Sequence, residues 1–456
     1  MSAGKDAADT TGATKGATMG PRPAHALTSG MISWSDPRLI AAILLLTAAG
    51  LVAAWLARSL GTPADLLAVW VAGEFWQMGR ADEIYPPAQG LFTMLPPRGW
   101  IDWLAATQGY EDAVYPFLYP PLWAVVMGTV APADFAPVAE ASYWINAGLL
   151  AATVVLAIRA SGALVHPVLH AVLVLVIFVT THIASVGFLQ GQPHILVAFL
   201  LVLAVERSRA GAQATAGAAL AIAASIKLFP LLYAAIWLAR GEKRALIAFA
   251  SVGAALAAAS VLLAGWPLHA AFLDGLRQIG RTLLVTGNNV SFDGIVGQVF
   301  ALDQAQIILG ANIDKMGDVR EAWPVAPRPE VWAALANAGL LAVVAGVAFA
   351  ARRLGTGALY AGLWPLLLTV TVLFTPTGWL YYIIPAAAFA PVMFAALPPA
   401  RGAALFLGGL ALFFSGRLLL VQSIPLIPFA EAFVYAGGTL VWGLGFALVA
   451  RERTKD

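Results

Sequence analysis

Two ionisable residues stand at positions where an apolar chain rarely carries a charge. Asp65 lies a few residues beyond the end of the first long apolar run, and Lys227, in "AASIKLFPLLY", has apolar or small neighbours on both sides. A carboxylate at a membrane–water boundary can keep its charge and accept a proton. An ammonium in such a segment suits an anionic partner such as a lipid-linked phosphate. Asp65 is therefore a candidate proton acceptor, and Lys227 is a candidate anion-binding residue.

Both residues also have structural explanations. Asp65 precedes "LLAVWVAG" and could accept the free amide hydrogens of a helix as its N-cap. Lys227 could extend towards the lipid headgroups from a turn made by Pro230. Neither alternative is excluded by the sequence.

Three polar or aromatic clusters interrupt the apolar runs at other points. Each has an ordinary explanation, because turns and loops are polar and aromatic belts form at membrane interfaces. Each could also bind a sugar or a phosphate. The candidates are Gln192 and His194 in "GFLQGQPHILVAF", Asn288 and Asn289 in "TGNNVSFDG", and Trp379, Tyr381 and Tyr382 in "FTPTGWLYYIIP".

The composition is that of a membrane protein. Of 456 residues, 60% are hydrophobic and 11% are charged, against about 25% charged residues in soluble domains. The formal net charge of +2 is too small to indicate nucleic-acid binding. There is no cysteine, so disulfides and thiolate catalysis are excluded. The six histidines show no metal-binding spacing, and we expect no cofactor, although a divalent cation is left open.

The apolar segments predict an all-α, polytopic transmembrane bundle. A span needs roughly 20 apolar residues, and twelve segments are candidates. They are preceded by a tail, 1–37, expected to be disordered, and residues 38–456 form a single membrane domain. The segments are 39–57, 138–158, 167–187, 192–206, 213–227, 228–240, 245–265, 331–350, 357–374, 381–397, 402–422 and 431–450.

Basic clusters predict the orientation. "ERSR", "RGEKR", "ARR" and "RER" should be cytoplasmic, as should both termini. Two long loops, 58–118 and 266–330, and the three clusters above then face the outside. In the first loop, "LLAVWVAGEFWQM" is expected to form an amphipathic helix at the membrane interface. The segment 119–132 is short for a span, so re-entrant, interfacial and spanning placements stay open, with 11 to 13 spans.

The order of these motifs resembles glycosyltransferase family 87, whose members include bacterial mannosyltransferases that use polyprenyl-phosphate-mannose. The resemblance extends over nearly the whole chain beyond residue 39. It rests on Asp65 after the first helix, with Trp70, Gly73 and Tyr85 following. It continues with "FLYPP", "GQPHILVAFLL", "IKLFPLL", "GNNVSFDG" and "TPTGWLYY".

The resemblance implies a GT-C membrane fold in the bacterial inner membrane and sugar transfer on the extracytoplasmic face. The donor would be a polyprenyl-phosphate-linked sugar, mannose or another hexose or pentose, and the acceptor a lipid or a glycan. Asp65 would be the general base. Lys227, or secondarily Arg281, would meet the charge of the leaving phosphate. Gln192, His194 and Asn289 would orient sugar hydroxyls or phosphate, and Tyr119 and Tyr382 would line the pocket.

Two departures from the family pattern affect the choice of substrate. Leu380 and Tyr381 follow Trp379, where related mannosyltransferases often carry histidine. The insertion 86–116 also lengthens the first loop. Both leave the sugar and the acceptor open.

Two other function classes would also be polytopic. A secondary transporter is expected to show inverted repeats and broken helices near the bilayer midplane. Here there is no detectable repeat, and the polar residues gather towards one face. A lipid flippase or a non-catalytic assembly partner should tolerate Asp65→Asn, because Asn caps a helix about as well as Asp.

Overall fold

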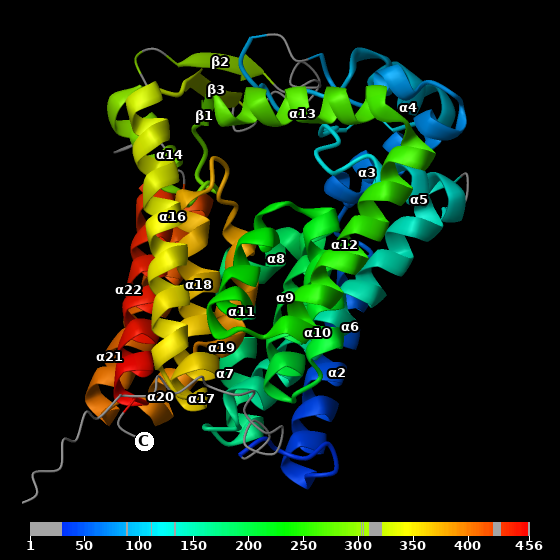
Figure 1. Ribbon diagram of the computed structural model, residues 1–456. Helices are drawn as coiled ribbons and strands as arrows, with labels where there is room; N and C mark the ends of the chain where they lie inside the picture. The colour runs from blue at the N-terminus through cyan, green and yellow to red at the C-terminus, as the bar shows by residue number, and fades with distance from the viewer. Residues whose placement is uncertain are drawn as a thin grey trace, which may run out of the picture.

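The computed structural model describes residues 30–87, 90–110, 112–131, 134–301, 303, 305–309, 322–422 and 430–454. Long helices stand side by side in one bundle, and shorter helices and a small sheet lie across one end of it (Figure 1). The bundle elements are α2 (Pro37–Ala57), α6 (Phe135–Ser161), α7 (Pro167–Thr180), α8 (His182–Leu189), α9 (His194–Arg209), α10 (Gln213–Ile226), η2 (Phe229–Tyr233), α11 (Ala234–Arg240), α12 (Lys243–Ala264), α16 (Glu330–Arg353), α17 (Thr356–Ala358), the π-helical η5 (Leu359–Leu363), α18 (Trp364–Val370), η6 (Thr371–Phe374), η7 (Leu380–Ile383), α19 (Ile384–Phe389), α20 (Val392–Ala396), α21 (Pro399–Gln422) and α22 (Ala430–Glu452).

The helix ends follow local sequence signals. Pro37 and Pro167 open α2 and α7, where a missing amide hydrogen costs nothing. The Asp36 side chain accepts a hydrogen bond from the amide of Arg38 and caps α2. Gly162 and Gly241 end α6 and α11 in the left-handed conformation that glycine adopts without strain.

The predicted helical, multi-pass class is confirmed. Each of the twelve predicted segments coincides with helix. Within the described residues, seven helices are long and apolar enough to cross a membrane, or eight if the bent pair α7–α8, with 67° between its halves, is one broken span. The count of about twelve stays a prediction, because the helical segments 213–226, 229–240 and 380–389 are shorter than a full crossing.

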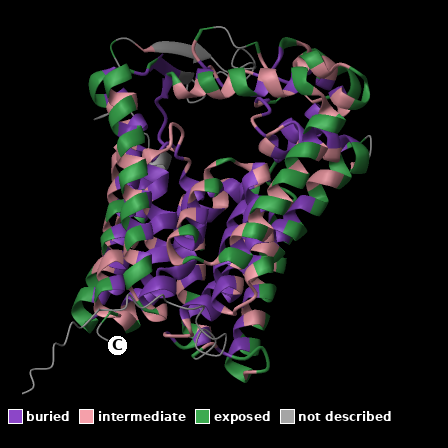
Figure 2. Cartoon of the chain, in the orientation of Figure 1, coloured by how far each residue is buried: buried purple, intermediate pink, exposed green. Residues whose placement is uncertain are grey.

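Burial divides the bundle into a core and a periphery. The segment 356–374 is 78% buried in its most apolar window, whereas α12 is only 6% buried. Exposed residues accordingly face outward on α12 and α16 (Figure 2). An apolar surface of this kind is expected where helices meet lipid rather than water.

The layer at the end of the bundle was only partly predicted. It contains α3 (Ala64–Gln77), η1 (Ala81–Glu83), α4 (Arg98–Gln108), α5 (Leu122–Val130), α13 (Trp266–Gly280) and α14 (Phe292–Phe300). The loop 266–330 also holds an antiparallel sheet of order β1-β3-β2, which the sequence did not lead us to expect. Its strands are β1 (Thr282–Leu284), β2 (Gln306–Leu309) and β3 (Ala322–Pro327), with Thr282 opposite Pro327 and Gln306 opposite Val325.

The helix α3 differs from the amphipathic helix expected there. It is buried around most of its circumference, from Leu66 to Gly73 and at Phe75, rather than along one stripe. Gly73 faces Gly128 of α5 so closely that a Cβ on Gly73 would lie 2.6 Å from the Gly128 nitrogen. The amphipathic pattern occurs instead in α4, whose buried residues are Trp100 and Leu104, and in α13.

The structure bears on two further expectations. The helix of 119–132 is the nine-residue α5, which at 1.5 Å per residue is far too short to span a bilayer. Of the predicted tail, residues 1–29 lie outside the described residues. Residues 30–36 pack on the bundle: Ile32 is buried and its carbonyl accepts a hydrogen bond from Arg159.

Candidate active site

A cavity of about 100 Å³ lies where α3, the turn between α8 and α9, and the end of α10 meet. Asp65 and Lys227 are the charged residues among those that line it. The other lining residues are Met94, Tyr115, Pro116, Leu118, Tyr119, Val186, Gln190, Gln192, Asn288, Trp379 and Tyr381. Segments far apart in sequence therefore bring most of the predicted residues to one place.

The turn at residues 190–192 positions Asp65. The amides of Asp65 and Leu66 both donate to the Gln190 carbonyl, which satisfies the start of α3 through backbone rather than through a side-chain cap. Gly191 has φ +62°, and a Cβ there would lie 2.8 Å from that of Pro63. Any other residue would separate the turn from α3. The helix begins at Ala64, so Asp65 is not its N-cap, contrary to the capping alternative.

Gln192 is the hub of the polar contacts at Asp65. Its Nε2 donates to Asp65 Oδ2 at 2.8 Å and to the Tyr381 hydroxyl at 2.8 Å. Its Oε1 accepts from the Tyr119 hydroxyl at 2.9 Å. Both hydrogens and the carbonyl oxygen of the amide are thus engaged, which fixes the orientation of the side chain and of the carboxylate it holds.

The environment of Asp65 favours a carboxylate that can take up a proton. Burial raises the pKa of Asp65 from 3.8 to about 6, and the hydrogen bond from Gln192 and the charge of Lys227 only partly oppose this rise. The side chain retains some exposure, at the cavity. A base with a pKa near the working pH combines ionisation with useful proton affinity.

Lys227 lies in an aromatic cage. Its ammonium donates to the Tyr382 hydroxyl at 2.9 Å and lies 4.8 Å from the centre of that ring and 5.2 Å from the centre of the Tyr119 ring. Among the described residues, no carboxylate forms an ion pair with it. An ammonium has three hydrogens to donate, so Lys227 keeps the capacity to bind an anion.

Among the described residues, two amide oxygens of cavity-lining side chains have no hydrogen-bond partner. They are Asn288 Oδ1 and Gln190 Oε1, both buried from solvent. Buried polar atoms are nearly always satisfied, so such exceptions need an explanation. Asn288 and Gln190 both line the cavity, and a wall with such amide side chains suits a ligand that carries hydroxyl groups.

Four predicted residues are absent from the cavity wall: Asn289, His194, Arg281 and Tyr382. Tyr382 contacts Lys227, whereas the contacts of Asn289 and His194 are structural. Asn289 is fully buried: its Oδ1 accepts from Ser291 and from the Gly378 amide, and its Nδ2 donates to the Leu284 carbonyl. This joins the loop 286–291 to the turn before Trp379. His194 is buried and stacks on Tyr382 at 4.3 Å between ring centres. Arg281 is exposed at the end of α13.

Sequence reasoning missed Met94 and Tyr115, which line the cavity from the insertion 86–116. Met94 has φ +59°, a backbone conformation that is uncommon for residues other than glycine. Met94 is apolar and Tyr115 stands in the insertion, outside every motif named above, so no local signal singled them out. Among the described residues, no group of three or more His, Cys, Asp or Glu side chains gathers as a metal site would require.

Comparison with known proteins gives one family. The sequence model of glycosyltransferase family 87 matches residues 117–376, more than half of the chain. That range contains Tyr119, Gln192, Lys227 and Asn288 but neither Asp65 nor Trp379. Among solved structures, ArnT from Cupriavidus metallidurans bound to undecaprenyl phosphate has 14% identity and a TM-score of 0.30, covering 90% of this chain and 77% of its own. No curated protein matches the sequence.

Proposed function

The chain belongs to glycosyltransferase family 87, and from this premise we propose that it transfers a sugar from a polyprenyl-phosphate donor to a hydroxyl of a lipid or glycan acceptor, with Asp65 as general base. The observation that carries the proposal is the hub at Gln192. It holds a carboxylate of raised pKa in the same small cavity as the ammonium of Lys227. A base and a cation on one cavity wall are what displacement of a phosphate by a hydroxyl requires.

The reaction is a single displacement. The acceptor oxygen attacks the anomeric carbon, and the bond between that carbon and the phosphate oxygen breaks. The acceptor proton passes to Asp65, and the polyprenyl phosphate leaves with the bonding electrons. Because one displacement inverts the attacked carbon, the product should have the anomeric configuration opposite to that of the donor.

Lys227 meets the charge that develops on the leaving phosphate. Its cage of Tyr119, Tyr381 and Tyr382 keeps the ammonium in place before the substrate arrives. Charges that are held in position in advance often lower the barrier of an enzymatic reaction more than any other single effect. Asn288, Gln190 and the Tyr381 hydroxyl would bind sugar hydroxyls, and the Trp379 ring would stack on the sugar.

A lipid-linked donor fits the cavity better than a nucleotide sugar does. A cavity of about 100 Å³ accepts the reacting groups rather than a whole lipid, whose chain would stay among the bundle helices and the membrane. The sequence has no glycine-rich phosphate loop of the kinds that bind nucleotides. A donor that already carries a phosphate leaving group needs none.

We assign the cavity to the extracytoplasmic face of the bacterial inner membrane. The helix α9 begins at His194, beside the hub, and its 16 residues end at Arg209, about 24 Å away. The ends of α9, α11 and α16 that carry basic residues meet there. The Ser208 hydroxyl donates to Glu242, and Arg240 donates to the carbonyl of Ala351. Basic clusters stay in the cytoplasm, so the opposite end faces outward. Mannose is the first sugar to test, on the family resemblance alone.

The test is sugar transfer by the purified protein, with extracted membrane lipids as acceptors. The donors are polyprenyl-phosphate-mannose, the corresponding glucose and arabinose compounds, and the nucleotide sugars GDP-mannose and UDP-glucose. We expect transfer from a polyprenyl-phosphate sugar and none from the nucleotide sugars. Transfer from a nucleotide sugar, or from none of the lipid-linked donors, would refute the proposed donor class.

A further inference from the structure

A second and larger cavity lies along the bundle, away from Asp65. It has a volume of about 690 Å³, within the range of ligand sites. Its walls come from α2, α6, α9 and α10, and most of them are apolar or small side chains, including Ile43, Gly148 and Leu203. Leu51 and Trp144 at its rim are exposed. It is therefore a groove that opens towards the membrane.

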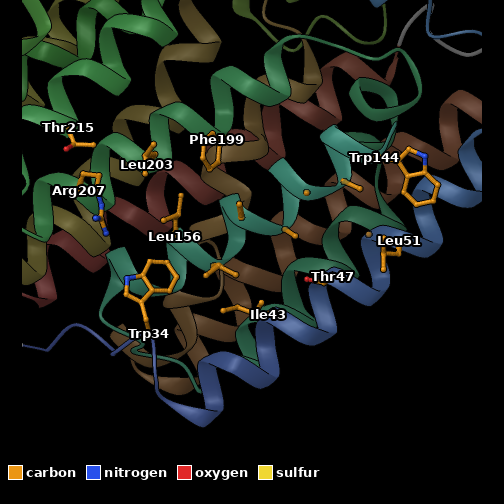
Figure 3. A pocket seen from close by; sticks show the side chains of 16 residues that line it. Trp34, Ile43, Thr47, Leu51, Trp144, Leu156, Phe199, Leu203, Arg207 and Thr215 are labelled. Atoms are coloured by element: carbon orange, nitrogen blue, oxygen red, sulfur yellow. The ribbon is translucent and has the colours of Figure 1, made fainter. Parts of the chain in front are cut away.

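The groove has the length of one lipid leaflet. Along α6 its lining runs from Trp144 to Leu156, about 18 Å at the rise of an α-helix. Half of a hydrocarbon core of roughly 30 Å is close to this length. Leu51 and Trp144 lie at one end, and Trp34, Arg207 and Thr215 lie at the other (Figure 3).

The end of the groove at Trp34 and Arg207 carries an excess of positive charge. Arg207 pairs with the fully buried Glu206, which also pairs with Arg159 at 2.9 Å. The Arg159 guanidinium lies 3.9 Å from the centre of the Trp34 ring. Arg209, on the same helix, is buried, and its Nε has no hydrogen-bond partner in the described part of the chain. Among the described residues, the group of Arg159, Arg207 and Arg209 thus holds three cations against one carboxylate.

We propose that this groove binds an anionic glycerophospholipid, with one acyl chain along α2 and α6 and the phosphate at Arg207. The phosphate supplies the negative charge that the arginine group lacks, and the apolar walls accept the chain. Arg207 is at the end of α9 far from the Gln192 hub, so a lipid bound here does not deliver its phosphate to Asp65. The site is separate from the proposed transferase site.

The test is lipid binding by the full-length protein, stripped of lipid in detergent. Phosphatidylglycerol and phosphatidylcholine with identical acyl chains are titrated separately, and bound lipids are counted by native mass spectrometry. We expect one tight phosphatidylglycerol site in the wild type and weaker phosphatidylcholine binding. Arg207→Gln should weaken phosphatidylglycerol binding about tenfold, the loss expected when a charge-assisted hydrogen bond is removed, and should abolish the preference.

A matched pair of glycine variants separates the groove from general effects on the bundle. Apart from the adjoining helix backbone, no described atom lies within 4 Å of a Cβ built on Gly148 or on Gly253 of α12, so both positions open on free space and are suited to leucine. Gly148→Leu fills the groove and should abolish the tight site, whereas Gly253→Leu should retain it. The proposal fails if Gly148→Leu binds phosphatidylglycerol like the wild type. It also fails if the wild type binds both lipids equally, or if polyprenyl phosphate displaces phosphatidylglycerol from the site.

Discussion

Two carboxylates of this chain, Asp293 and Asp65, have opposite surroundings. Asp293 is buried and paired with a cation: Arg328 lies 2.8 Å and 3.0 Å from its two oxygens, and the Trp332 indole donates to it at 2.7 Å. From the residues that the structure describes, Asp65 accepts one side-chain hydrogen bond, donated by an uncharged amide, and it lies on a cavity wall. The Asp293 side chain ties α14 to the start of α16, whereas the Asp65 carboxylate can still accept further hydrogen bonds.

These surroundings distinguish Asp293, a polar group that stabilises the fold, from Asp65, a polar group that can react. Burial raises the pKa of both carboxyl groups. At Asp293 an arginine compensates the buried charge, whereas at Asp65 the nearest cation, Lys227, forms no ion pair with it. A group left uncompensated in a cavity is the better candidate for chemistry.

The largest predicted difference is between the asparagine variants of these two residues. Asp65→Asn should lower kcat for sugar transfer by about 10²–10⁴-fold, because the general base is lost, while the melting temperature is unchanged or higher. Asp293→Asn should leave kcat per folded molecule near that of the wild type. It should lower the free energy of unfolding by about 3 kcal/mol, because Arg328 would be left buried and unpaired. Steady-state kinetics and thermal unfolding of both variants test this prediction. A loss of kcat in Asp293→Asn together with a loss of stability in Asp65→Asn would contradict it.

Removing the cation from the cavity should have the next largest effect. Lys227→Met keeps the length of the side chain and loses the ammonium. We expect kcat to fall by about 10²–10³-fold, as when one charge-stabilising donor is removed. Steady-state kinetics at saturating donor would measure it. Activity close to wild type would show that the leaving phosphate is met elsewhere.

A smaller and more diagnostic effect is expected at the hub. Gln192→Leu removes the hydrogen bond that lowers the pKa of Asp65, so the acid limb of kcat/KM should move to higher pH. At the optimum, a loss of about tenfold is expected from one hydrogen bond. A pH–rate profile separates this from simple misfolding, which would lower the rate without moving the limb.

The smallest effect is predicted for the weaker phosphate candidate. Arg281 is exposed at the end of α13 and is absent from the cavity wall. Arg281→Gln should therefore leave kcat and KM unchanged, and it serves as the control for Lys227→Met. A large loss of activity would mean that the outer layer closes over the cavity during the reaction.

The sequence predicted most of the bundle, because apolar segments of membrane length leave the backbone little choice but helix. It predicted the wrong character for α3, since burial on several sides depends on the contact between Gly73 and Gly128, which no local pattern records. The sheet of residues 282–327 was missed for a similar reason. Its strands are short and pair across a long interval of sequence.

The candidate site was predictable in its residue types but not in its partners. Asp65, Gln192, Lys227 and Tyr381 attracted attention as polar or aromatic groups between apolar runs, and they do line one cavity. Asn288 and Asn289 are adjacent and chemically identical, yet only Asn288 lines it. The direction in which each side chain points depends on the turn that the pair forms with residues 378–380. Such a distinction requires the tertiary structure.

The most direct test of the central claim is the pH dependence of kcat/KM for sugar transfer, measured for wild type and Asp65→Asn side by side. The pKa of Asp65 is raised to about 6, and a general base works only when deprotonated. The wild-type rate should therefore rise with pH up to about 6 and then level off, because kcat/KM reports the base of the free enzyme. The residual rate of Asp65→Asn should lack this limb. The same limb in both proteins, or a wild-type rate that does not fall below pH 6, would contradict the assignment of Asp65 as the base.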